Sequence, residues 1–174
     1  YNEVIFRKLK DADADILCLQ EFFTAVIPHH LNFIDSIAGM LNYPYYYFSY
    51  DRPKFEGKFY SGSIIFSRYP IADTQKVVYP GPFIGSIIRA GVIISGDTVD
   101  IFTTRLQSVH FQREDYMELS SMKSGSDNSL SGAKSIIHKL RLGYRRRVEQ
   151  VKLVKDMIRK SNRPLVFTGD LNDV

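Results

Sequence analysis

Residues 164–173 read PLVFTGDLND, a short apolar run that opens into two acids and an amide. Residues 15–21 read DILCLQE, a second apolar run that ends in a carboxylate. Continuous apolar runs of this length predict strands that are covered on both faces. The ends of such strands are where α/β folds collect ligand-binding groups, so we expect Glu21, Asp170 and Asn172 to lie at a functional site.

The segments around these two runs predict an α/β fold with a mixed or antiparallel sheet. Apolar side chains at spacings of three and four indicate helices over residues 2–10 and 28–42, and a long amphipathic helix from Ile137 to Ile158 that ends before Asn162. β-rich runs indicate further strands at residues 62–67, 77–79, 87–95 and 99–104, with a hairpin turn at Gly96-Asp97. Gly143 lies inside the long helix, where it marks either a kink or the start of the continuous part.

The composition is that of one globular domain. The chain has 174 residues, of which 44% are hydrophobic and 24% are charged, enough for a core without disulfide or metal staples. The single cysteine, Cys18, excludes an internal disulfide and lies in an apolar run, so we expect a small buried hydrophobe. The longest apolar stretch, residues 84–95, is interrupted by Arg89 and is too short for a membrane helix, so the chain as given is expected to be soluble.

Positive charge is concentrated in the long predicted helix. Residues 134–160 hold ten Lys or Arg against Glu149 and Asp156, a balance of +8, whereas the whole chain carries +4. Such a face either is solvated or meets a polyanion such as nucleic acid or a phospholipid surface. Residues 120–132 read SSMKSGSDNSLSG and predict a mobile loop, because they offer too little apolar surface to offset the entropy of ordering.

The oxygen-bearing side chains at the two strand ends suit a hard divalent cation. Mg²⁺ prefers oxygen ligands, keeps several waters and is typically held by one or two carboxylates together with a substrate phosphate. Glu21 and Asp170 match that requirement. Taken singly, each acid is more typical of a solvated strand cap or a turn, so the order of motifs along the chain decides between the two interpretations.

Four motifs occur in order along the chain. They are D-I-x-x-L-Q-E at residues 15–21, G-x-x-I-x-S-x-x-P-I at 62–71, a T-x-L strand end at 104–106 and G-D-x-N-D at 169–173. Together they resemble the motifs of the endonuclease/exonuclease/phosphatase family of DNase I-like phosphoesterases. The resemblance implies a four-layer α/β sandwich, two mixed β-sheets flanked by helices, of which residues 1–174 form a single truncated domain.

The same resemblance implies a phosphoesterase that uses Mg²⁺ or Mn²⁺ and attacks the phosphate in line with water. Glu21 is then a metal ligand, Asp170 orients or deprotonates the water, and Asn172 holds the phosphate or a metal-bound water. Asp170 and Asn172 are counted with Glu21 in the catalytic and metal-binding set. This chemistry is coherent because a metal neutralises the anionic phosphate while a carboxylate positions the water. The implied substrate is a phosphodiester or phosphomonoester in a nucleic acid, a nucleotide or a lipid headgroup, and no obligate protein partner is expected.

Two arginines complete the set of candidate site residues. Arg105 stands where the family often has His in a T-H-L strand end, and a guanidinium cannot act as a base because it stays protonated near neutral pH. A guanidinium still clamps phosphate oxygens, so Arg105 is a candidate both for catalysis and for phosphate binding. Arg89 is a second candidate phosphate ligand, with a cross-strand or surface ion pair as an equal alternative.

The motifs do not include two parts of the family's site, an earlier strand with a metal-binding Asn and a later Asp-His pair. We therefore expect an internal fragment of a longer catalytic domain. Residues 106–111, LQSVHF, resemble bacterial relatives that carry membrane helices ahead of the catalytic domain, which would make the parent protein envelope-anchored. The alternative function is a non-catalytic module of the same fold that binds phosphate or nucleic acid through the basic helix.

Overall fold

The structure is a computed structural model, and it describes residues 2–27, 32–82, 84–109, 113, 117 and 129–172. Along the chain its elements are α1 (Asn2–Ala12), β1 (Ile16–Ala25), α2 (Phe33–Met40), β2 (Tyr45–Phe48), β3 (Arg52–Lys54), β4 (Phe59–Ser67), β5 (Ile71–Val78), β6 (Ser86–Ile94), β7 (Asp97–Arg105), α4 (Ser129–Arg159) and β8 (Leu165–Asp170). Asp173, the last residue of the G-D-x-N-D motif, lies outside the described residues.

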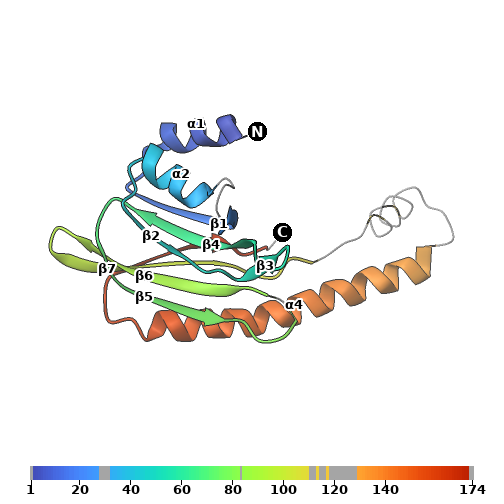
Figure 1. Ribbon diagram of the computed structural model, residues 1–174. Coiled ribbons are helices and arrows are strands. Elements are labelled where there is room, and N and C mark those ends of the chain that lie inside the picture. Colours follow the sequence, from blue (N-terminus) through green and yellow to red (C-terminus); the bar gives the residue numbers. More distant parts are fainter. Residues whose placement is uncertain are drawn as a thin grey trace.

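Two β-sheets form the centre of the fold. In the first sheet β4 pairs with β1 along one edge and with β2 and β3 along the other, and all of these pairs are antiparallel. The second sheet has the order β5-β6-β7-β8 and is mixed, because β7 and β8 run parallel. Figure 1 shows α1 and α2 over the first sheet and α4 under the second. The predicted four-layer α/β sandwich is confirmed.

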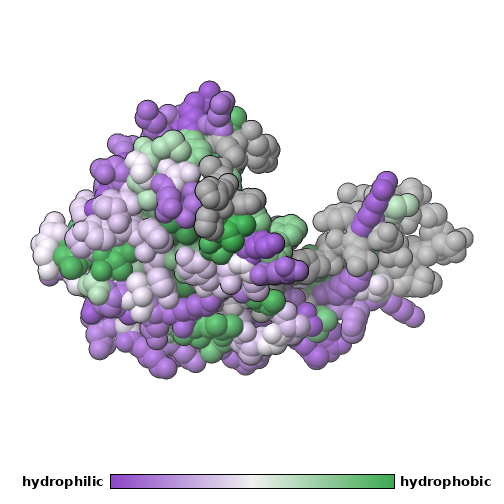
Figure 2. Space-filling view, viewed as in Figure 1, coloured by the Kyte–Doolittle hydropathy of each residue, from purple (hydrophilic) through white to green (hydrophobic). Residues whose placement is uncertain are grey.

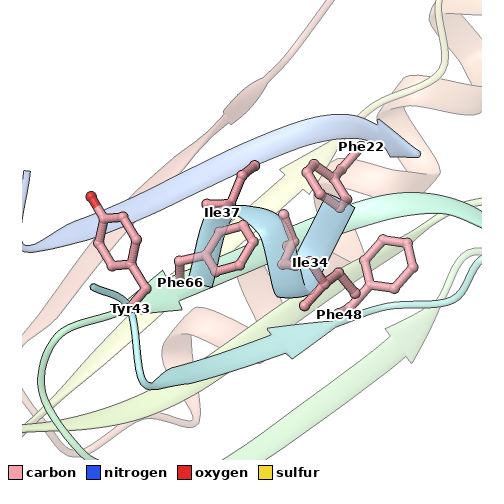
Figure 3. Close-up of a cluster of buried hydrophobic side chains, with 7 residues drawn as sticks. Phe22, Ile34, Ile37, Tyr43, Phe48 and Phe66 are labelled. Carbon is pink, nitrogen blue, oxygen red and sulfur yellow. The ribbon is translucent and has the colours of Figure 1, made fainter. Parts of the chain in front are cut away.

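α2 packs on the outer face of the first sheet, as Figure 3 shows. The helix starts at a side-chain cap, because Asn32 Oδ1 accepts a hydrogen bond from the backbone N–H of Ile34. Ile34 and Ile37, one turn apart, then face the phenylalanine rings of the sheet. The observed helix is shorter than the predicted one, which began at Pro28; residues 28–31 lie outside the described part of the chain.

Strand alternation decides which side chains fill the space between the two sheets. In β6, Ile88, Ala90 and Val92 point toward the first sheet and are fully buried, whereas Ile87 points toward α4. Cys18 of β1, expected to be buried, is partly buried against the inter-sheet cluster, and this burial raises the pKa of its thiol. The inter-sheet layer therefore fixes how the two sheets lie relative to each other.

The long predicted helix is confirmed as α4, which runs without interruption from Ser129 to Arg159. Its first residues fall within the segment 120–132 that was expected to be a loop, and residues 120–128 lie outside the described residues. Gly143 has a packing role, because a Cβ there would lie 2.8 Å from Val109 Cγ2. None of the helices in the described residues is long and apolar enough to cross a membrane.

The turn between β6 and β7 lies one residue earlier than predicted. Ile94 pairs with Asp97, so the two-residue turn is Ser95-Gly96, not Gly96-Asp97. Both turn residues have positive φ, +53° at Ser95 and +93° at Gly96, as the favoured hairpin turns require. Gly96 adopts a positive φ readily, but nothing in the sequence indicates that Ser95, the other turn residue, does so as well.

Candidate functional site

A bulge in β1 sets the position of Glu21. Leu19 and Phe22 of β1 pair with residues only two apart in β4, so Gln20 and Glu21 together oppose one residue of that strand. The backbone of Glu21 is left-handed, with φ of +53°. β1 therefore does not end at Glu21, as its sequence suggested, but continues to Ala25.

The bulge turns two consecutive side chains toward the second sheet. Gln20 Nε2 donates a hydrogen bond of 2.8 Å to Thr103 Oγ1 of β7. Glu21 Oε1 lies 3.2 Å from Arg105 Nη2 at the end of the same strand. In a regular strand these neighbours would point to opposite faces, so the extra residue is what brings both to β7.

Arg105 joins carboxylates from both sheets. Arg105 and Asp170 end the parallel strands β7 and β8 in register, and Arg105 Nε lies 3.3 Å from Asp170 Oδ2. The Arg105 side chain is 21% exposed, whereas those of Asp170 and Glu21 are 45% and 68% exposed. The guanidinium thus lies between two carboxylates that solvent and ligands can reach.

The turn after β8 holds Asp170 and Asn172 together. The backbone N–H of Asn172 donates to Asp170 Oδ1 at 3.0 Å, and Asn172 Nδ2 donates to the Leu106 carbonyl at 2.7 Å. One residue earlier, Gly169 lets β8 lie close to the β7 backbone, because a Cβ there would lie 2.4 Å from the Thr104 carbonyl oxygen. Of the three residues predicted from the strand ends, Glu21 and Asp170 both contact Arg105, and Asn172 is held beside Asp170.

A cleft of about 340 Å³ opens beside Glu21 and Arg105. Its walls come from β1, β3, β4, the start of β6 and the end of β7. The lining residues are Glu21, Phe23, Asp51, Arg52, Lys54, Ser61, Gly62, Ser63, Ile84, Gly85, Ser86 and Arg105. The cleft is therefore lined mainly by polar and charged side chains.

Asp51 is a residue of the cleft that sequence reasoning missed. Its side chain is only 7% exposed and lies 2.9 Å from Lys76 Nζ. Asp51 also accepts hydrogen bonds of 2.7 Å from the hydroxyls of Ser49 and Ser86. These contacts compensate a buried charge and fix the wall of the cleft, but a single acid in a turn-rich stretch gave no signal in the sequence.

The structure does not bring Arg89 to this cleft. Arg89 shares with Ile87 the face of β6 that points to α4. Its guanidinium pairs with Asp73 and lies 2.7 Å from Asp100. Hydrogen bonds from Arg163 and then Arg89 hold the pKa of Asp73 below its usual value. Of the two predictions for Arg89, the ion pair is the one observed, and the residue is not part of the candidate site.

The donor set is compatible with one hard divalent cation. No cluster of three or more His, Cys, Asp or Glu side chains occurs among the residues that the structure describes. Mg²⁺ needs fewer protein ligands, since it is typically bound by one or two carboxylates, waters and a substrate phosphate. Glu21, at 68% exposure, meets that need directly, whereas both oxygens of Asp170 already accept hydrogen bonds.

A family model matches the sequence over nearly its whole length. The model describes the endonuclease/exonuclease/phosphatase family and aligns with residues 3–174. The chain belongs to this family. No curated protein matches the sequence significantly.

Solved structures of the same fold are similar at low sequence identity. Beta toxin from Staphylococcus aureus, in a β-hairpin deletion mutant, has a TM-score of 0.62 and 18% identity, over 98% of this chain and 58% of that chain. TDP2 of D. rerio, complexed with a single-strand DNA product, has a TM-score of 0.60 and 16% identity, over 99% of this chain and 53% of that chain. SmcL has a TM-score of 0.57 and 16% identity, over 97% of this chain and 55% of that chain. The chain thus spans about half the length of these solved structures.

Proposed function

We propose that the protein is a divalent-metal-dependent phosphoesterase that hydrolyses a phosphodiester or phosphomonoester by in-line attack of water. One observation carries the proposal: Glu21 of the first sheet and Asp170 of the second both contact the Arg105 guanidinium, and Glu21 and Arg105 line one cleft. An accessible carboxylate and a guanidinium on one cleft, with a second accessible carboxylate in contact with that guanidinium, match the electrostatic needs of phosphate-ester hydrolysis.

Each residue has a role that its contacts support. Glu21 would hold Mg²⁺ or Mn²⁺, and a metal bound there supplies neutralising charge to the phosphate. Arg105 donates to phosphate oxygens, as guanidinium groups do. Asp170 orients the attacking water, and Asn172 is placed beside it to hold the phosphate or a water, because Asn172 donates to Asp170 Oδ1 through its backbone.

The substrate belongs to one of three classes: nucleic acid, nucleotide or lipid headgroup. Nucleic acid is the first class to test, since the similar TDP2 structure holds a single-strand DNA product. No obligate protein partner is part of the proposal.

Turnover of bis-p-nitrophenyl phosphate by the full-length protein tests the proposal. Mg²⁺ or Mn²⁺ should support turnover and a chelator should abolish it. Glu21→Gln and Asp170→Asn should each lower kcat about a hundredfold or more, the scale on which loss of one preorganised group reduces a rate. Glu3→Gln, at an exposed acid in the first turn of α1, is the matched control. Undiminished turnover in both site variants would reject the site.

A non-catalytic phosphate- or nucleic-acid-binding module is the second candidate. This alternative is favoured by the contacts of Arg105 with Glu21 and Asp170, because the guanidinium offsets the negative charge of the carboxylates that would bind a metal. Binding that falls steeply with ionic strength and needs no metal would support this alternative, whereas metal-dependent turnover would exclude it.

A further inference from the structure

The sheet face beside Glu21 carries a row of aromatic, small and cationic side chains. Phe23 of β1, Ser61 of β4 and Arg52 of β3 are paired across three neighbouring strands, so their side chains share one face. Lys54 shares the face of Arg52 because side chains alternate along a strand. All four line the same cleft as Glu21.

Three phenylalanines extend this face toward the turn between β3 and β4. The rings of Phe23 and Phe59 are stacked, with centroids 5.2 Å apart and planes 7° apart. Phe55 meets Phe59 edge-on at 5.5 Å. Phe23 is 37% exposed and Phe55 is 69% exposed. Grouped exposed rings of this kind mark a surface that binds a ligand or a partner.

The two cations of the row are available to an anionic ligand. Among the residues that the structure describes, no acidic side chain forms an ion pair with Arg52 or Lys54. The acid next to them in sequence, Asp51, is already compensated by Lys76 and two serine hydroxyls. Positive charge therefore remains on this wall of the cleft.

We propose that this face binds single-stranded nucleic acid, with backbone phosphates on Arg52 and Lys54 and bases against Phe23 and Phe55. Binding sites for single strands combine a positive groove with aromatic side chains on which bases stack. Ser61, which lies between Phe23 and Arg52, has a small side chain and so leaves room on the sheet for the nucleic acid. This proposal rests on the proposed function in one respect: the bound nucleic acid is taken to continue toward Arg105, where the reacting phosphate would lie.

The arrangement favours a single strand over a duplex or a lipid surface. In a duplex the base faces stack on one another and cannot meet the phenylalanine rings. A lipid surface meets apolar side chains that protrude from the protein. Of the four residues proposed to bind, Phe55 is of that kind, whereas Arg52, Lys54 and Phe23 line a cleft of about 340 Å³. Near the position of β3 in Figure 1, Figure 2 shows hydrophobic and hydrophilic surface side by side.

Fluorescence anisotropy with a labelled 12-nucleotide oligothymidylate measures this binding in the full chain, with EDTA present so that no metal-dependent hydrolysis occurs. For single strands the slope of log K against log salt is about −0.7 per neutralised phosphate. The double variant Arg52→Gln/Lys54→Gln should therefore reduce the steepness of the slope by about 1.4. Phe55→Ala, at an exposed ring, should weaken binding about fivefold or more.

A charge-matched control lies on α1, which covers the opposite face of the first sheet (Figure 1). Lys8→Gln/Lys10→Gln also removes two exposed positive charges, and it should leave both the affinity and the salt slope unchanged. Figure 2 shows that the surface over α1 is hydrophilic, so these substitutions remove charge without exposing a core.

Several outcomes would overturn the inference. They are an unchanged salt slope in the Arg52/Lys54 double variant, unchanged affinity in Phe55→Ala, a 12-base-pair duplex that binds as tightly as the single strand, or binding to phosphatidylglycerol vesicles without binding to the oligonucleotide. Turnover of bis-p-nitrophenyl phosphate by the unmodified protein tests the proposed function alone. Because the anisotropy measurement needs no turnover, oligonucleotide binding and phosphoesterase activity can each fail without the other.

Discussion

Glu21→Gly should be more stable than Glu21→Ala, the reverse of the order found in ordinary strands. Glu21 has φ of +53°, and this left-handed conformation costs a residue with a Cβ about 1–2 kcal/mol. Alanine keeps that cost, whereas glycine does not. In a regular strand, by contrast, a protein with glycine is less stable than the same protein with alanine by about 0.5–1 kcal/mol, because glycine loses more conformational freedom on folding.

The expected difference follows from the contacts of Glu21. Both substitutions remove the ion pair with Arg105, and that loss cancels when the two variants are compared. Relief of about 1–2 kcal/mol of backbone strain, less the greater entropy cost of glycine, leaves the Gly variant about 0.5–1 kcal/mol more stable than the Ala variant. Both variants should lose turnover, because the carboxylate proposed to hold the metal is gone.

Urea unfolding followed by circular dichroism measures the two free energies, which are comparable if the slope m is unchanged. Thr74 is the matched control position, because its side chain is exposed and it lies in the regular part of β5. There the Ala variant should be the more stable of the pair. If the Ala variant is the more stable one at both positions, the bulge conformation assigned to Glu21 is refuted.

Two further predictions concern stability away from the cleft. Arg163 and then Arg89 hold the pKa of Asp73 below its usual value, so Asp73 adds stability above about pH 4 that is lost as the pH falls toward its folded pKa. In Arg163→Gln the free energy of unfolding, measured in urea, should fall less steeply as the pH drops below about 4. The same pH dependence as in the unmodified protein would contradict the role of Arg163 in lowering the pKa of Asp73. Gly143→Ala should lower the Tm although alanine favours helices by about 1 kcal/mol, because its Cβ would lie 2.8 Å from Val109 Cγ2. Adding Val109→Ala should reverse the sign, and a higher Tm for Gly143→Ala alone would disprove the contact.

The elements that the sequence predicts well are those with a local signal. α4 is the clearest case, because its apolar residues recur with the helical period regardless of what they pack against. The strand that ends at Asp170 is short and apolar, and its turn residues follow directly, so the position of Asp170 was also predictable. The prediction that Glu21 and Asp170 share a site came instead from the order of the four motifs along the whole chain.

The features that the sequence does not reveal depend on pairing between distant strands. The bulge at Gln20 and Glu21 exists only relative to β4, and no residue type in DILCLQE marks it. Arg89 lies in a run buried on both faces, so alternation could not show which sheet face it occupies. Asp51 becomes part of the cleft only because β3 pairs with β4 beside it.

The geometry at Arg105 depends on how closely the two sheets pack. Glu21 belongs to the first sheet, whereas Arg105 and Asp170 belong to the second, so the layer between the sheets sets their separation. That layer includes Ile65 and Ile88, which are completely buried. Interiors are close-packed and transmit small volume changes, so a change of volume in this layer would shift Glu21 relative to Arg105, whose ion pair spans 3.2 Å. The core that holds the sheets together is therefore also what holds the two halves of the candidate site in contact.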